Sequence, residues 1–173
     1  MQPQVIWISE MWQYKVIDNF LSDKDFKILT GNLFDKNADN EVERIFCNYD
    51  PTPQVADLLD EFSDHRQYKE LKKFIHYAIT PPNFKHHMHD EAPFKIMSAI
   101  IYLHPEENYG TTLYHQDEVV EVEWKPNRLM VFCGETGVTW HDYKSSSIRY
   151  TYNYFLVDPT QILNEEYKKY VIK

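Results

Sequence analysis

The chain has 173 residues, 43% of them hydrophobic and 26% charged, and its 27 acidic and 18 basic side chains give a formal net charge of −9. This length suits one domain with a sizeable core, and the apolar fraction argues against wholesale disorder. No apolar run approaches the roughly 20 residues that a membrane-spanning helix needs. The acidic surplus argues against binding to a nucleic-acid backbone, because such binding needs a basic surface.

Cysteine usage and the N-terminal residues indicate a soluble cytoplasmic protein. The two cysteines, Cys47 and Cys133, are too few for a disulfide scaffold, so reduced thiols are expected. Residues 1–10 lack the basic and long apolar stretches of a secretory signal peptide. The oligomeric state does not follow from these features. The 16% of aromatic residues favours a small β-rich core that is filled with rings.

The N-terminal segment predicts two strands followed by a helix. Residues 5–8 and 14–17 are typical of short strands. Ser22 is a candidate helix N-cap, and Gly31 weakens the helix near its end. The apolar residues at helical spacing are Phe26, Leu29 and Leu33.

One more strand and two more helices are expected before the middle of the chain. Residues 42–49 have a strand pattern, and Pro81 and Pro82 cannot continue a helix. Two stripes of apolar residues between these points recur at helical spacing, which predicts two packing helices. The first stripe is Val55, Leu58, Leu59 and Phe62, and the second is Tyr68, Leu71, Phe74, Ile75 and Ala78.

From His86 onward the sequence consists of apolar strand patterns that are separated by short turns. The turn signals are Asn-Tyr-Gly, Lys-Pro-Asn and the Gly-rich segment 134–137. Several short strands with regular turns indicate a sandwich or a barrel. The expected strands are residues 94–103, 111–114, 119–124, 129–133 and 148–157.

These patterns predict an α+β fold in which helices cover one side of a barrel-like sheet. No repeat, linker or charge block divides the sequence, so we expect one domain over residues 1–173. Residues 1–83 are expected to form strands and supporting helices, residues 84–158 the β core, and residues 159–173 a helical tail.

A histidine-rich segment, residues 86–91, is the first candidate for a functional site. In a regular strand the side chains of His87, His89 and Glu91 lie on one face, since successive side chains alternate. One imidazole and one carboxylate two residues apart can share a metal ion. His141 follows about fifty residues later. Two imidazoles and one carboxylate are the ligand set of non-haem Fe(II) oxygenases, which leaves positions open for a co-substrate and dioxygen.

The last strand pattern supplies a candidate anion site. Alternation places Arg149, Thr151 and Asn153 on one face. A buried arginine is costly unless it binds an anion, and no acidic residue is near Arg149 in sequence. Its guanidinium can hold a carboxylate through two parallel hydrogen bonds, and the Thr151 hydroxyl can reach the same group. The pattern therefore predicts a bound dicarboxylate.

This arrangement resembles the 2-oxoglutarate- and Fe(II)-dependent dioxygenases, in particular short bacterial or phage-type members of the prolyl-hydroxylase-like branch. That family has a His-x-Asp/Glu pair, a distal His and, roughly ten residues later, a basic residue. The resemblance covers residues 87–157 and, less closely, 15–30. The matching residues are His89, Asp90, Glu91, His141 and Arg149.

The resemblance implies a double-stranded β-helix, the cupin-like jelly roll, that binds Fe(II), 2-oxoglutarate and O2. It also implies hydroxylation of a C–H bond with release of succinate and CO2. A prolyl or other residue of a peptide or protein is the first candidate substrate, and a small molecule stays open because fold and cofactor do not determine substrate. The implied metal ligands are His89, Glu91 and His141, and the implied 2-oxoglutarate contacts are Arg149, Thr151 and Tyr102.

Two details of the metal site stay open. The carboxylate is Glu91, where most of the family has Asp, and a β-bulge would exchange Glu91 for Asp90. His87 shares the predicted face of His89 and is the main rival ligand.

Two other classes of protein compete with the enzyme. A non-catalytic cupin-like module could bind a metal or ligand through His87, His89 and a later histidine. The flanking glycines and the more distant Glu of cupins are missing, which counts against that class. A degenerate β-helix that serves as an interaction scaffold is disfavoured by the intact set of His89, Glu91, His141 and Arg149.

Overall fold

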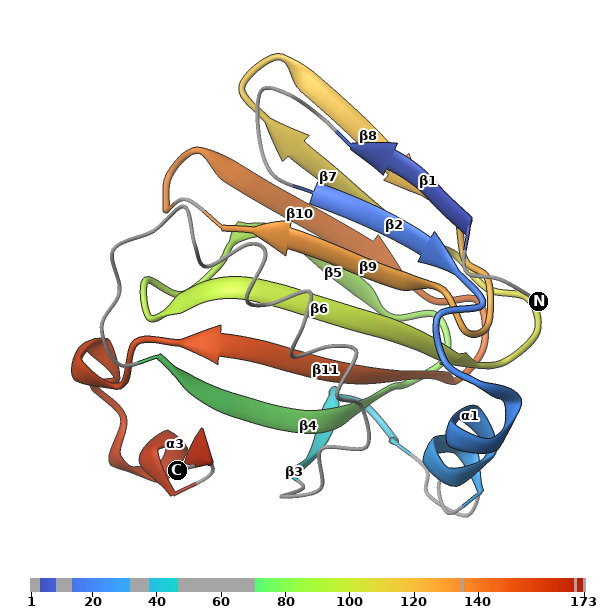
Figure 1. Ribbon diagram of the computed structural model, residues 1–173, viewed down its shortest axis with the longest axis horizontal. Coiled ribbons are helices and arrows are strands. Elements are labelled where there is room, and N and C mark those ends of the chain that lie inside the picture. The colour runs from blue at the N-terminus through green and yellow to red at the C-terminus, as the bar shows by residue number, and fades with distance from the viewer. Residues whose placement is uncertain are drawn as a thin grey trace.

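The chain folds into two antiparallel β-sheets that face each other, with a short helix against the outer side of the larger sheet (Figure 1). The computed structural model describes residues 4–8, 14–31, 38–46, 71–134, 136–169 and 171–172. None of the helices in these ranges is long and apolar enough to cross a membrane.

The larger sheet has eight strands in the order β1-β2-β9-β6-β11-β4-β12, and β3 also pairs with β4. Each pair of neighbouring strands in this order is antiparallel. The strands are β1 (Gln4–Ile8), β2 (Tyr14–Asp18), β3 (Glu43–Phe46), β4 (Lys72–Thr80), β6 (Lys95–His104), β9 (Leu129–Cys133), β11 (Arg149–Val157) and β12 (Val171–Ile172).

The smaller sheet has four strands in the order β5-β10-β7-β8. The chain changes sheet at each step from β4 to β7 and again from β8 to β11. This alternation agrees with the predicted barrel-like arrangement, because it stacks two sheets from one continuous segment. The strands are β5 (Lys85–Asp90), β7 (Thr111–His115), β8 (Glu118–Val122) and β10 (Thr139–Lys144).

Apolar side chains pack on both faces of the larger sheet. On the outer face of the larger sheet, Ile75 and Ile79 of β4 belong to a cluster that includes Leu29 of the helix. Between the sheets, a second cluster joins Tyr102 of β6 to Leu113 of β7. Because side chains alternate along a strand, β6 and β9 contribute to both clusters.

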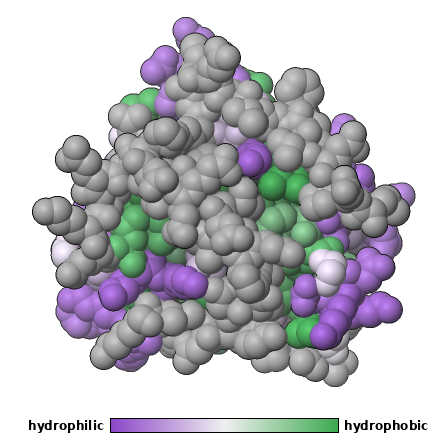
Figure 2. Space-filling model, viewed as in Figure 1, coloured by the Kyte–Doolittle hydropathy of each residue, from purple (hydrophilic) through white to green (hydrophobic). Residues whose placement is uncertain are grey.

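The helix α1 (Asp23–Thr30) begins where the sequence predicts it. The Ser22 hydroxyl accepts a hydrogen bond from the Asp25 backbone N–H at 3.1 Å, which satisfies one free donor of the first turn. Leu29 is buried, while the exposed side of the helix is hydrophilic and is visible as purple spheres at the lower right of Figure 2. Leu33 lies outside the described residues.

The prediction of a helix over residues 68–78 was wrong, because β4 occupies most of this segment as a strand. Phe74 and Ala78 are buried on one face of β4, and Ile75 and Ile79 are buried on the other. A strand that is buried on both faces can reproduce the apolar spacing of a helix. Pairing with β11 along all of Lys72–Thr80 decides the conformation.

Few of the expected supporting helices are present in the described ranges. The first predicted stripe, residues 55–62, lies outside them. The predicted helical tail is only partly helical: a 3-10 turn, Pro159–Gln161, and a single turn, α3 (Glu165–Lys168), precede β12, which pairs with β4. The architecture is therefore two antiparallel sheets with little helix.

Candidate functional site

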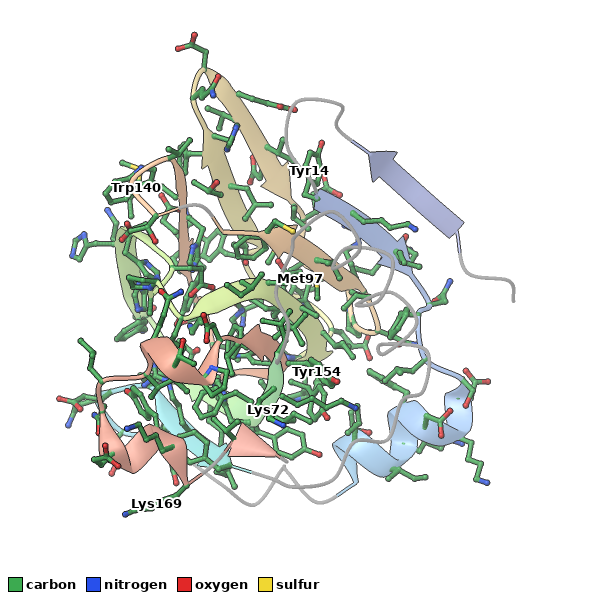
Figure 3. The ribbon with its side chains drawn as sticks, turned by 60° about the vertical axis from the view of Figure 1, so that its left-hand side comes forward. Tyr14, Lys72, Met97, Trp140, Tyr154 and Lys169 are labelled. Atoms are coloured by element: carbon green, nitrogen blue, oxygen red, sulfur yellow. The ribbon has the colours of Figure 1, made fainter. Side chains whose placement is uncertain are left out.

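A small cavity of about 40 Å³ lies between the two sheets. It is lined by Arg149 and Thr151 from β11 and by His141 and Tyr143 from β10. Figure 3 shows the side chains that fill the space between the sheets, with Trp140 marking β10 and Tyr154 marking β11. The fold thus brings predicted residues that are far apart in sequence to one place.

Arg149 is a buried cation with no acidic partner among the described residues. Its side chain is 3% exposed, and Nη2 donates to Thr111 Oγ1 at 3.1 Å. Its Nε is buried and has no hydrogen-bond partner. Burial lowers the pKa of Arg149, while the neighbouring Tyr102 and Tyr143 act in the opposite direction.

Three aromatic rings surround this guanidinium. Its central carbon lies 4.4 Å from the ring centroid of Tyr143, 5.0 Å from that of Trp124 and 5.3 Å from that of Tyr102. Cation–π contacts stabilise a desolvated guanidinium in part, but they do not neutralise its charge. The site is therefore electrostatically incomplete, and an anion is the missing component.

The other two predicted anion-site residues lie beside Arg149. The Tyr102 hydroxyl donates to Thr111 Oγ1 at 2.9 Å, so Thr111 connects Tyr102 to the guanidinium. Thr151 lines the same cavity as Arg149. Thr111 was missed by the sequence reasoning, because its role depends on how β7 of the smaller sheet faces β6 and β11 of the larger one.

The imidazoles of His89 and His141 are neighbours on β5 and β10. Their ring centroids are 4.1 Å apart, and their Cα atoms are paired in the strand register. His89 Nδ1 lies 2.8 Å from the carbonyl oxygen of His87. A carbonyl only accepts, so Nδ1 must donate, and this leaves the other ring nitrogen of a neutral His89 with a lone pair that can bind a metal.

His141 is also suited to bind a cation as a neutral imidazole. It is 5% exposed, and its Nδ1 is buried with no hydrogen-bond partner. Burial lowers the pKa of His141 to about 4, although the negative charge of Glu91 acts to raise it. The protein therefore holds this ring uncharged at neutral pH, which is the form that ligates metal ions.

A β-bulge changes which histidine lies beside His89. His141 pairs with His89 but Tyr143 pairs with His86, so two residues of β5 oppose one of β10. The His86 ring consequently lies 4.0 Å from the His89 ring, and His87 is exposed. The prediction that His87 shares a face with His89 was wrong, because it assumed a regular strand.

Glu91 is buried between two hydrogen-bond donors. Lys95 Nζ donates to Oε2 and Ser98 Oγ donates to Oε1, both at 2.7 Å. Burial acts to raise the pKa of Glu91, but the charges of Lys95 and His141 and these two hydrogen bonds lower it to about 2. A Cβ at Gly134 would lie 3.0 Å from Glu91 Cβ, so the glycine permits the close packing.

Asp90, the alternative carboxylate, is engaged elsewhere. Its Oδ2 accepts a hydrogen bond from the Gly137 backbone N–H at 2.9 Å, in the turn before β10. Of the two acidic residues, Glu91 is the one whose charge acts on His141.

The donor types suit Fe(II), but both oxygens of the Glu91 carboxylate are engaged, one by Lys95 and one by Ser98. Among the described residues, no three His, Cys, Asp or Glu side chains are placed to hold a metal ion as they stand. The two imidazoles fit a metal site, since one has its tautomer set by a carbonyl and the other has an unpartnered buried nitrogen. Glu91 can complete this set of metal ligands only if its hydrogen bond with Lys95 is broken.

His76, which had no signal in the sequence, is paired with Asn153, which strand alternation placed on the face of Arg149. Asn153 Nδ2 lies 3.2 Å from His76 Nε2, and Asn153 also lines the cavity. The His76 ring is packed between the rings of Phe46, Phe74 and Phe155. Burial lowers the pKa of His76 to about 3, so this histidine is neutral in the folded protein at neutral pH.

No protein-family model matches the sequence, and no curated protein matches it. The fold, in contrast, is similar to solved structures. A prolyl hydroxylase from Trichoplax adhaerens, in complex with a hypoxia inducible factor peptide fragment, superposes with a TM-score of 0.68 at 16% identity over 86% of this chain and 84% of that one. A Pseudomonas putida prolyl-4-hydroxylase gives a TM-score of 0.61 at 15% identity over 83% and 91%.

Enzymes with other reactions share the same fold. The non-heme alpha ketoglutarate dependent epimerase SnoN from nogalamycin biosynthesis gives a TM-score of 0.63 at 12% identity, over 85% of this chain and 78% of that one. The chain therefore has the fold of the 2-oxoglutarate-dependent oxygenases, with prolyl hydroxylases among its structural neighbours. At the level of the fold, the resemblance seen in the sequence is confirmed.

Proposed function

We propose that this protein is an Fe(II)- and 2-oxoglutarate-dependent oxygenase with a double-stranded β-helix core, which hydroxylates a C–H bond and releases succinate and CO2. The observation that carries this proposal is Arg149, a buried guanidinium that has an unpartnered Nε and no carboxylate within reach among the described residues. Such a group needs an anion, and it lies in the same cavity as His141.

The chemistry around Arg149 favours a dicarboxylate over a simple inorganic anion. The guanidinium can donate to one carboxylate through two hydrogen bonds, and the Thr151 hydroxyl can donate to the same group. The remaining part of the ligand then extends along the cavity to His141 on the facing sheet. A keto acid at that end can chelate a metal ion held by the imidazole pair.

We propose His89, Glu91 and His141 as the residues that hold Fe(II). This ligand set occupies one face of the metal and leaves three positions for the co-substrate and dioxygen. When bound, the iron supplies the oxidative chemistry that breaks the C–H bond, while the chain binds and orients the reactants.

For the substrate we propose a prolyl or other residue of a peptide or protein. Four of the similar structures are prolyl hydroxylases, and the one from Trichoplax adhaerens holds a peptide fragment. The epimerase SnoN and the carbocyclase SnoK show that this fold also serves other outcomes. The similarity in fold therefore supports the proposal of 2-oxoglutarate as co-substrate more strongly than the proposal of a prolyl substrate.

Anaerobic titration of the protein with Fe(II) and then 2-oxoglutarate tests the proposal. Chelation of iron by a keto acid should produce a charge-transfer band in the visible spectrum. Succinate, which has both carboxylates but no keto group, is the matched control and should produce no band. Addition of O2 should then convert 2-oxoglutarate to succinate. Iron binding without any response to 2-oxoglutarate would favour the non-catalytic cupin-like module.

A further inference from the structure

The Glu91–Lys95 ion pair occupies the carboxylate that the proposed iron site needs. Glu91 is 6% exposed, and its Oε2 accepts a hydrogen bond from Lys95 Nζ at 2.7 Å. Both groups lie at the turn between β5 and β6, where the Lys95 backbone N–H donates to the Ala92 carbonyl at 2.8 Å. The short separation in sequence keeps this ammonium close to the carboxylate.

The Lys95 ammonium makes a second contact, with an aromatic ring, but its side chain can still move away from Glu91. Its Nζ lies 4.0 Å from the centroid of the Phe155 ring, which is a cation–π contact. The side chain is 21% exposed, so a change of its rotamers can carry the ammonium into solvent. Glu91 has no such freedom, because it is buried against Gly134 and is held by Ser98.

We propose that Lys95 is a stand-in cation, which neutralises Glu91 in the metal-free protein and gives way when a divalent cation binds. The inference rests on the proposed function, since it takes His89, Glu91 and His141 as the ligands. It explains why these side chains do not converge on one point: Glu91 is turned toward Lys95.

Electrostatics makes the two cations competitors. A buried carboxylate is costly without a counter-ion, so some cation must accompany Glu91 at all times. An ammonium left at hydrogen-bond distance from Glu91 would lie within a few ångströms of the bound metal ion and repel it. Ser98 is neutral, so its hydrogen bond to Oε1 does not repel a metal ion, and displacement of Lys95 frees Oε2 of the carboxylate. Because a metal ion must first displace Lys95, the presence of Lys95 lowers the apparent affinity of the site for metal.

Substitution of Lys95 by methionine tests this competition. Methionine keeps an unbranched apolar side chain against Phe155 but removes the charge. Mn(II) binding is followed under argon by the EPR signal of free Mn(II), and unfolding of the metal-free protein is followed separately. Lys95→Met should bind Mn(II) about tenfold more tightly, or more, and its metal-free form should unfold more easily because Glu91 has lost its counter-ion.

Two variants serve as controls. Lys144→Met removes a lysine that also lies over a ring, Tyr109 at 4.1 Å, and should leave Mn(II) affinity unchanged. Lys95→Arg retains the cation and should stay close to the wild-type affinity. In a Glu91→Gln background, where there is no carboxylate to lose its counter-ion, Lys95→Met should no longer destabilise the metal-free protein.

The opposite changes in metal affinity and metal-free stability separate this role from a purely structural one. Equal or weaker Mn(II) binding by Lys95→Met would overturn the proposal, because Lys95 would then only orient Glu91. If the wild type fails to bind Mn(II) but Lys95→Met binds it, the proposal is supported in its strongest form. If neither protein binds Mn(II) or Fe(II), the iron site of the proposed function is wrong, and this inference fails with it.

Discussion

His89 and His141 face each other across an antiparallel strand pair, with ring centroids 4.1 Å apart. They come from strands that are separated by four others in the chain, and the His141 ring also lies 5.4 Å from the ring of Phe132 in the larger sheet. This relationship is the geometric basis of the proposed metal site.

Loss of His141 should abolish Fe(II) binding. His141→Ala removes one of two adjacent imidazoles, and the two remaining ligands cannot retain the metal. His87→Ala is the matched control and should bind Fe(II) largely as the wild type does, because His87 is exposed. Anaerobic Fe(II) titration measures both variants. If His87→Ala loses the metal while Glu91→Ala keeps it, the ligand set is closer to that of a cupin.

Truncation of Arg149 should weaken 2-oxoglutarate binding without affecting the metal. The guanidinium is buried and its Nε is unpartnered, so Arg149→Ala should weaken 2-oxoglutarate by ~100-fold or more. Arg149→Lys should be intermediate, because it keeps the charge but loses the planar pair of donors. The measurement is the apparent affinity for 2-oxoglutarate at fixed Fe(II), with iron binding checked separately. Normal 2-oxoglutarate binding by Arg149→Ala would remove the main support for the co-substrate.

Acid should destabilise the protein through His76. Burial lowers the pKa of His76 from 6.5 to about 3, so the unfolded chain takes up this proton at a higher pH than the folded protein. The stability that this histidine contributes is present above pH 6.5 and is lost as the pH falls toward 3. Between pH 7 and pH 5 the loss from one such group is about 2 kcal/mol.

Replacement of His76 by phenylalanine isolates this contribution. The ring already lies among Phe46, Phe74 and Phe155, so the site should accept another aromatic side chain. Urea unfolding at pH 7 and pH 5 should show a smaller loss of stability for His76→Phe than for the wild type. His141, whose pKa is lowered to about 4, should account for part of the remaining loss. An identical loss in both proteins would show that His76 does not carry this dependence.

Asp18 should be important for stability. Its carboxylate accepts hydrogen bonds from Arg128 Nε and Lys125 Nζ, both at 2.6 Å, and it is 6% exposed. Burial acts to raise the pKa of Asp18, but these two partners lower it overall. Asp18→Asn leaves Arg128 without its counter-ion and should destabilise the fold by about 2–4 kcal/mol. Asp117→Asn, in an exposed turn, should change the unfolding free energy little when both are measured in urea.

The sequence predicted the features that depend on local pattern. Apolar runs between turn signals identified most strands, such as 94–103 and 129–133, and Ser22 marked the start of α1. The sequence also suggested the chemistry of the candidate site, since the spacing of His141 and Arg149 pointed to a metal site next to an anion site. Strand alternation placed Arg149 and Thr151 on one face, and both line the cavity that His141 also lines.

Tertiary structure decided what depends on neighbours that are distant in the chain. Residues 72–80 have helical spacing, but pairing with β11 on one side and β3 on the other makes them a strand. A bulge against β10 turned His86, instead of His87, toward His89. Register and burial are set by partners on other strands, so no window of sequence contains them. For the same reason only the folded chain shows that Lys95 holds Glu91 and that Arg149 has no carboxylate of its own.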